Sequence, residues 1–198
     1  MSTSTLEFLE TYIVKSVKVG LKRYGKDGTF TISNREGAEN KSTHYSDRIS
    51  IILLWSNIGA ITLKIHFKIE TAKKLAGKIF NLPATQIADE AAMDFMRELN
   101  NIVGGGIRGD FEKNKILVGM SLPFVAQGMD EAVFKKIRDP RTTCNVQKLS
   151  NGEDEVTVST EIYLEDAEAV ERVRETLQKD LDARDNSDTD NLGDVDFF

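Results

Sequence analysis

Hydrophobic positions recur every three or four residues in four parts of the chain, the spacing that gives a helix one apolar face. The second part ends before Pro83, which cannot continue a helix, and the third ends before three glycines, each costing up to about 1 kcal/mol in a helix interior. The pattern therefore predicts helices at residues 4–24, Thr71–Phe80, Thr85–Val103 and Glu165–Leu181.

Other segments are rich in β-branched and aromatic residues, as strands are. Two pairs of them are separated by short connections with turn-forming residues, Ser56-Asn57 in one and Ser150-Asn151-Gly152 in the other, so each pair is expected to form a β-hairpin. Strands that outnumber helices and form hairpins are typical of an α+β fold with helices packed on a mostly antiparallel sheet. A helix–strand–strand–helix order recurs weakly in the two halves. The predicted strands are Thr29–Ser33, Arg48–Trp55, Ile58–Phe67, Lys115–Gly119, Leu122–Ala126, Thr142–Leu149 and Glu155–Leu164, with a loop at Asn34–Asp47.

The third predicted helix carries a polar pattern that packing does not require. At 100° per residue, Asp94, Glu98 and Asn101 fall on one narrow stripe at the rim of the apolar face, whereas Asn100 points away from it. Gly105 lies one turn further along the stripe. A rigid acid and amide side by side can grip a partner and orient a water molecule.

On spacing alone, a solvated helix face also accounts for this stripe. Against that reading, Asp94 and Glu98 are like charges four residues apart, which costs about 0.2–0.5 kcal/mol, although Arg97 beside them can offset the repulsion. The spacing by itself leaves both readings open.

Composition excludes several classes of function. The 198 residues suit one domain with a tail, and the single Cys144 and the two histidines, His44 and His66, do not have metal-ligand spacing. His66 reads as a sheet residue. The longest apolar run, Ile49–Trp55, is too short to cross a bilayer, and no signal peptide opens the chain, so a cytoplasmic protein without a metal site or membrane segment is expected. No nucleophilic triad or phosphate-binding loop is recognisable.

The formal charge of −6 is concentrated at the carboxy terminus. Residues 180–198 contain seven aspartates and one arginine, so the rest of the chain is neutral overall. A neutral body without a basic stripe argues against nucleic acid as a partner. The segment Asp182–Phe198 has too little apolar surface to fold alone and is expected to be disordered. It reads either as a solubility tail or, through Phe197 and Phe198, as an anchor for a protein partner.

The spacing Asp94-x3-Glu98-x2-Asn101, with a glycine just beyond and Pro123 about twenty residues on, resembles the signature of the CheC/CheX/FliY chemotaxis phosphatases. The resemblance extends over about Ile49–Gly128. The amino-terminal helix offers no second copy of the motif, which favours the CheX-like branch. Where relatives often have Gly-Asn-Ala-Lys, this chain has glycines at 104–106 followed by Ile-Arg. The resemblance divides the chain into a CheX-like domain at 1–164, a helix at 165–181 and a tail at 182–198.

The resemblance implies a substrate and a role for each residue of the stripe. The substrate would be the phospho-aspartate of a CheY-like response regulator, which contributes Mg²⁺ and a lysine, so this chain needs no cofactor of its own. Asn101 would position the attacking water and Glu98 would pair with the lysine. Asp94 would support Glu98 or contact the partner, and Gly105 would let the partner's backbone approach.

Two further expectations concern assembly and turnover. CheX-like relatives form symmetric dimers, so a homodimer is expected. The alternative to a phosphatase is a non-catalytic receiver-binding adaptor or scaffold. The three consecutive glycines and the additional carboxy-terminal helix leave room for that alternative.

Overall fold

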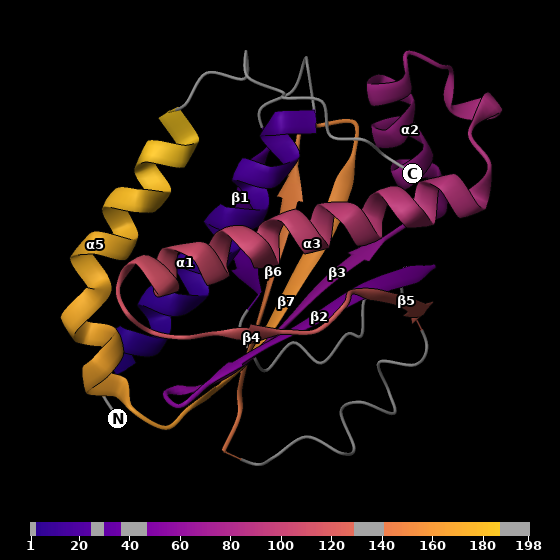
Figure 1. The fold of residues 1–198 in the computed structure, drawn as a ribbon. Helices are drawn as coiled ribbons and strands as arrows, with labels where there is room; N and C mark the ends of the chain where they lie inside the picture. Colours follow the sequence, from indigo (N-terminus) through magenta and orange to yellow (C-terminus); the bar gives the residue numbers. More distant parts are fainter. Residues whose placement is uncertain (1–2, 25–29, 37–46, 129–140, 187–198) are drawn as a thin grey trace.

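Helices and strands follow one another along the chain in the order that the hydrophobic pattern predicts (Figure 1). The computed structural model describes residues 3–24, 30–36, 47–128 and 141–186. The helices of this part are α1 (Thr3–Tyr24), α2 (Ile69–Phe80), α3 (Asp89–Lys113) and α5 (Ala167–Asn186), with a short 3₁₀ turn η1 (Ala84–Gln86). The strands are β1 (Thr31–Glu36), β2 (Arg48–Ser56), β3 (Gly59–Phe67), β4 (Gly119–Met120), β5 (Phe124–Gln127), β6 (Thr143–Ser150) and β7 (Glu155–Leu164).

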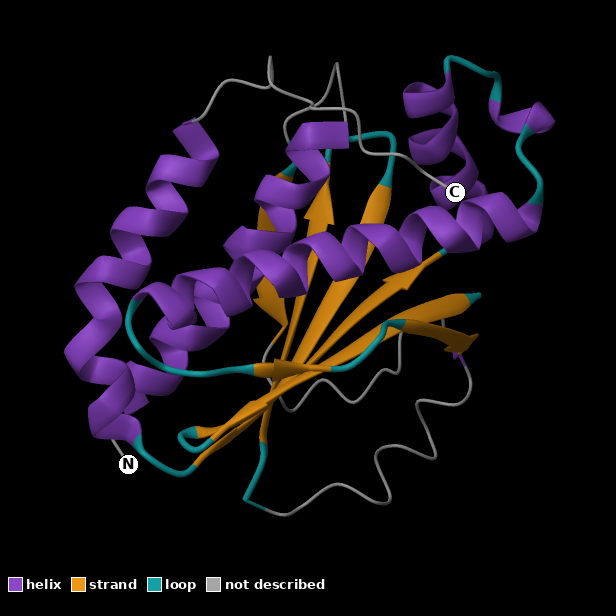
Figure 2. Cartoon of the chain, in the orientation of Figure 1, coloured by secondary structure: helices purple, strands orange, loops and turns teal. Residues whose placement is uncertain are grey.

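The strands form one seven-stranded antiparallel sheet in the order β1-β6-β7-β3-β2-β4, with β5 also pairing with β2 (Figure 2). Both predicted hairpins, β2–β3 and β6–β7, are present, and they meet at the centre where β3 pairs with β7. Each hairpin also receives a strand from the other half of the chain, because β1 pairs with β6 while β4 and β5 pair with β2. The first half of the chain thus adds β1 to the second hairpin, and the second half adds β4 and β5 to the first hairpin. The α+β prediction is confirmed.

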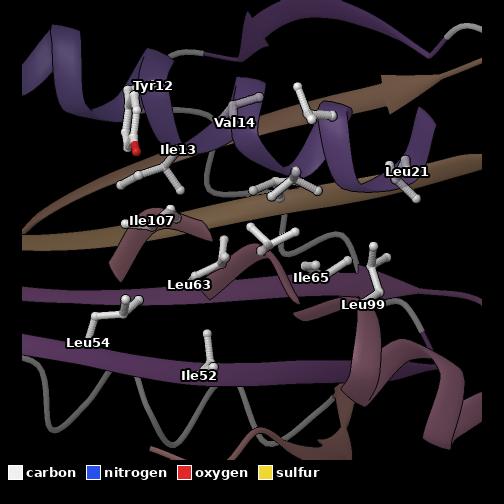
Figure 3. Close-up of a cluster of buried hydrophobic side chains, with 14 of the residues drawn as sticks. Tyr12, Ile13, Val14, Leu21, Ile52, Leu54, Leu63, Ile65, Leu99 and Ile107 are labelled. Atoms are coloured by element: carbon white, nitrogen blue, oxygen red, sulfur yellow. The ribbon is translucent and has the colours of Figure 1, made fainter. Parts of the chain in front are cut away.

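Two helices cover the same face of this sheet. Helix α1 contacts β6 and β7, α3 contacts β2 and β3, and the two helices contact each other. Figure 3 shows their side chains meeting those of the strands in one apolar core, where Ile13, Leu63, Leu99 and Ile107 are fully buried. The helices approach closely at Gly20, where an added Cβ would lie 2.8 Å from Val103. The core therefore holds α3 on two sides, against the sheet and against α1.

The predicted end of the third helix is wrong. Helix α3 does not stop at Val103 but continues through the glycines at 104–106 to Lys113. A Cβ on Gly104 would lie 2.9 Å from Ile52 Cδ1, and one on Gly106 would lie 2.4 Å from Arg184 Nη1. Two of these glycines are thus sites of close packing, so the surrounding structure compensates for their low helix propensity.

The predicted strand Lys115–Gly119 is also wrong over most of its length, because only Gly119 and Met120 pair with β2. Lys115 has a φ of 63°, and its N–H donates to the carbonyl of Glu112 at 2.9 Å. These residues terminate α3 instead of joining the sheet. At the other edge, β1 extends to Glu36, so the first residues of the predicted loop Asn34–Asp47 belong to a strand.

The last helix extends further than its apolar pattern indicates. Helix α5 ends at Asn186, so residues 182–186 of the predicted tail are helical. The remainder of the tail, including Phe197 and Phe198, lies outside the described residues, and its role as a solubility tail or a protein anchor stays a prediction. None of the described helices is long and apolar enough to span a membrane.

Candidate functional site

The start of α3 is fixed by charge. Asp89 and Glu90 lie in its first turn, where carboxylates interact favourably with the helix dipole. Lys73 of α2 approaches Asp89 at 2.6 Å and ties the two helices together. This hydrogen bond raises the pKa of Lys73 above its ordinary value. The polar stripe thus begins on a helix that is anchored at its amino-terminal end.

Glu98 and Asn101 lie side by side on the outward face of α3, both half-buried. The Nδ2 of Asn101 donates to Oε2 of Glu98 at 3.4 Å, a long hydrogen bond across three residues. No described residue forms an ion pair with Glu98, and none donates to the Oδ1 of Asn101. The pair therefore presents one carboxylate and one amide carbonyl at the surface of α3.

Asp94 is exposed and is held by Arg97, whose Nη1 donates to its carboxylate. The Nη2 of Arg97 also lies 3.5 Å from Oε1 of Glu90. Arg97 consequently offsets the repulsion expected between Asp94 and Glu98. Asp94 shares the stripe but pairs with Arg97 and not with Glu98.

Gly105 differs from its two glycine neighbours. An added Cβ would meet nothing within 4 Å at Gly105, whereas it would meet Ile52 and Met120 at Gly104 and Arg184 at Gly106. The surface one turn beyond Asn101 is therefore open backbone, and the role of Gly105 as a point of close approach by a partner stays a prediction.

The buried face of α3 includes a polar residue to which the sequence analysis gave no role. Asn100 is fully buried, and its Nδ2 donates to Oγ of Ser50, which is fully buried in β2, at 3.1 Å. Met96 and Val103 on the same face are also buried, so the face that packs lies further from the stripe than predicted. The helical geometry indicated that Asn100 points away from the stripe, but nothing in the sequence indicated its partner in β2.

A buried polar network joins α3 to the two other long helices. The carboxylate of Asp110 accepts from the Tyr12 hydroxyl at 2.7 Å and from Nη2 of Arg184 at 2.6 Å. Burial, followed by the Asp110 charge and hydrogen bond, raises the pKa of Tyr12 well above its usual range. Arg184, near the end of α5, thereby fixes α5 to both α1 and α3.

Helix α5 covers α1 but leaves the stripe on α3 uncovered. It contacts α1 more extensively than α3, with the guanidinium of Arg174 lying 5.0 Å above the ring of Phe8 and Glu171 accepting from Thr5 at 3.0 Å. The hydrogen bond from Arg174, then that from Thr5, lowers the pKa of Glu171. The outward face of α1 is therefore occupied within the chain.

The histidine among the described residues has a structural role in the sheet. His66 lies in β3, as predicted for a sheet residue, and its Nε2 is 2.7 Å from Oγ of Ser159 in β7. Among the described residues, no three side chains of the metal-binding types gather at one point.

Comparison with known proteins gives the fold and the family. The structure is similar to the chemotaxis protein CheX from Vibrio vulnificus, with a TM-score of 0.61 at 14% identity over 79% of this chain and 99% of that one. It is also similar to a chain of the CheX–CheY–BeF₃–Mg²⁺ complex from Borrelia burgdorferi (TM-score 0.58, 16% identity, 78% and 97% covered) and to Thermotoga maritima FliY (0.51, 14%, 91% and 98%). No curated protein sequence matches the chain.

These similarities define the chain as an α+β domain of the type found in chemotaxis phosphatases. Residues 50–147 match the family model described as "Chemotaxis phosphatase CheX". This part of the chain belongs to the CheX family of chemotaxis phosphatases. The matched residues include β2 from Ser50 onward, β3, the whole of α3 and hence the complete stripe.

Proposed function

We propose that this protein is a phosphatase that hydrolyses the phospho-aspartate of a CheY-like response regulator. The observation that carries the proposal is the outward-facing pair of Glu98 and Asn101 on a helix held by the sheet and by α1. Membership of a family described as chemotaxis phosphatases supports it, as does the similarity to a CheX chain in complex with CheY. The response regulators that would serve as substrates are intracellular, so a cytoplasmic setting belongs to the same proposal.

In the proposed reaction, Asn101 orients the attacking water. The amide carbonyl accepts a hydrogen bond from the water, and the amide NH₂ can donate to a phosphoryl oxygen once the partner has displaced it from Glu98. The water oxygen forms the new bond to phosphorus, the bond from phosphorus to the aspartyl oxygen breaks, and its electron pair remains on the carboxylate. Both protons of the water leave with the released phosphate as dihydrogen phosphate. An acyl phosphate hydrolyses unaided, so positioning alone accelerates the reaction. A neutral amide suits this role because a carboxylate would repel the phosphoryl group.

Glu98 then fixes the position of the partner. Its carboxylate has no ion pair within the described residues, so it is available for the lysine of the receiver. The receiver also supplies Mg²⁺, which neutralises the phosphoryl charge, and this chain contributes no cofactor. Asp94, held by Arg97 at the edge of the stripe, contacts the partner's surface.

Replacing Gly105 by alanine is expected to raise stability and lower activity together. The site is helical and the added methyl meets nothing, so unfolding should cost about 0.5–1 kcal/mol more. The same methyl would hold the partner's backbone away from Asn101, so KM should rise severalfold. Thermal melting and steady-state phosphate release measure the two effects.

Gly109→Ala is the matched control for this prediction. Gly109 is also helical, and an added Cβ there would also meet nothing within 4 Å. It lies one turn further from Asn101, so the same gain in stability is expected without a change in KM. If Gly105→Ala and Gly109→Ala had equal KM values, Gly105 would not be a point of contact with the partner.

We also propose that the protein is a homodimer. Large apolar side chains lie exposed around the short edge strands β4 and β5, with Leu117 80% and Leu122 87% accessible in the single chain. A second copy covering them would remove this apolar surface from water. Sedimentation at micromolar concentration should give twice the 22.1 kDa chain mass, and Leu122→Glu should shift it toward the single chain. A clean monomer for the wild type would contradict the proposal.

The rival function is a receiver-binding adaptor without turnover. A panel of candidate receivers, each tested for binding and for loss of a phosphoryl label, separates the two. The phosphatase shortens the lifetime of the label on at least one receiver that it binds. An adaptor binds the receiver loaded with a phosphoryl mimic and leaves that lifetime unchanged.

A further inference from the structure

The residue next to Asn101 projects from α3 about 100° further round the helix and lies inside the core. Asn100 is fully buried, and its Nδ2 donates to Oγ of Ser50 in β2 at 3.1 Å. Neighbouring residues in the two elements are apolar and buried, namely Leu99 and Val103 in α3 and Ile52 in β2. The amide and hydroxyl therefore form a polar pair in an otherwise hydrophobic part of the α3–β2 interface.

A gain in folding stability does not explain why the Asn100–Ser50 pair is polar. The Oδ1 of Asn100 accepts no hydrogen bond from any described residue. A buried acceptor without a donor costs free energy, whereas two apolar side chains of the same shape would avoid that cost. A buried polar contact does have one well-attested use, which is to select a single register between packed elements because it is directional.

In this protein the two packed elements joined by the polar contact are α3 and β2. Gly104, one turn after Asn100, brings the helix close to the strand, since an added Cβ would lie 2.9 Å from Ile52 Cδ1. Ser50 and Ile52 are alternate residues of β2 and point to the same face. The glycine contact sets the distance between α3 and β2, and the hydrogen bond sets the rotation of α3 about its axis.

Rotation matters because the outward side chains turn with the helix. The outer surface of a helix lies about 6 Å from its axis, so a rotation of about 10° displaces a side chain there by about 1 Å. A displacement of that size is enough to lower a rate by about 100-fold when catalysis depends on positioning. Glu98 and Asn101 are on this outer surface.

We propose that Asn100 is a positioning residue: through its hydrogen bond to Ser50, it sets the rotation of α3 on β2 and so directs Glu98 and Asn101 at the partner. The kinetic consequence rests on the proposed phosphatase function. The structural consequence does not, because it concerns only the orientation of α3.

The test replaces both members of the pair, in the variant Asn100→Leu/Ser50→Ala. Its melting temperature should equal or exceed that of the wild type, because no polar group is left unpaired. For a phosphorylated receiver, kcat should fall by about 10- to 100-fold while KM stays within about twofold. Met96→Leu is the control, since Met96 is buried on the same face, one turn earlier, and its kcat should not change.

A second readout is independent of turnover. The side-chain amide signal of Asn101 in a ¹⁵N-correlated NMR spectrum of the protein alone should shift in the double variant and not in Met96→Leu. If the wild type did not dephosphorylate any receiver, the proposed function would fail, while this signal would still decide the role of Asn100. Ser50→Ala alone gives the same readouts if the double variant folds poorly. A kcat within twofold of wild type together with an unshifted Asn101 signal would overturn the proposal.

Discussion

Replacing Asn101 by alanine is expected to lower the stimulated dephosphorylation of the cognate receiver by about 100-fold or more, the scale of one lost oriented polar contact in a transition state. Asn101 is half-buried and, among the described residues, its side chain is hydrogen-bonded to Glu98 of the same helix alone, so the fold should remain intact. Phosphate release under steady-state conditions measures the rate, and circular dichroism confirms that the variant is folded.

Two further variants sharpen this test. Asn101→Asp retains the size of the side chain but places a carboxylate beside the phosphoryl group, so it should be at least as inactive as Asn101→Ala. Arg108→Gln alters an exposed residue of the same helix whose ion pair in the described part of the chain is a surface one with Glu112, so its rate should match the wild type. Equal rates for Asn101→Ala and Arg108→Gln would remove Asn101 from the mechanism.

The largest loss of stability is expected for Asp110→Ala. The variant removes the shared acceptor of Tyr12 and Arg184, leaving a buried hydroxyl and a largely buried guanidinium without their closest partner. Removal of one member of a buried ion pair typically costs about 3–5 kcal/mol. The free energy of unfolding should fall by that amount in denaturant titrations, and α5 should lose its attachment to α3 before the core melts.

Glu112→Ala provides the comparison for Asp110. It removes a carboxylate two residues later on the same helix, where the partner Arg108 is exposed and the ion pair is a surface one. Such pairs contribute about 0–1 kcal/mol. A loss for Asp110→Ala no greater than that for Glu112→Ala would show that the network of Tyr12, Asp110 and Arg184 does not anchor α5.

The sequence predicted the features that depend on local pattern. Helical spacing identified all four described helices, and turn residues identified both hairpins, because these signals lie within a few residues of the elements that they form. The stripe of Asp94, Glu98, Asn101 and Gly105 also needed only the geometry of one helix. Its residues lie on the surface of α3 that α5 leaves uncovered, and their roles in function stay predictions.

The features that the sequence did not predict depend on contacts between distant segments. Helix α3 continues through Gly104 and Gly106, against which Ile52, Met120 and Arg184 pack closely, and through Gly105, whose surroundings are open. Likewise, α5 continues past Leu181 because Arg184 reaches Asp110. Propensity alone places a helix end at both points, and tertiary packing overrides it.

Contacts between distant segments were equally unpredictable at the candidate functional site. The position of Asn100 on the helix indicated that it points away from the stripe, but nothing in the sequence pairs it with Ser50, fifty residues earlier. The pairing of Asp94 with Arg97 was within reach because the two residues are three apart on one helix. Contacts within one element were thus predictable, and contacts across the core were not.

The central claim is that Glu98 and Asn101 make this chain a catalyst acting on a phosphorylated receiver. The most direct measurement follows the decay of a phosphoryl label on a purified cognate receiver, with this protein added at one tenth of the receiver concentration. We expect all of the label to be lost faster than from the receiver alone, over several turnovers per chain, and Asn101→Ala to abolish the acceleration. An unchanged decay with a receiver that binds tightly in its phosphoryl-mimic form would contradict it and identify an adaptor.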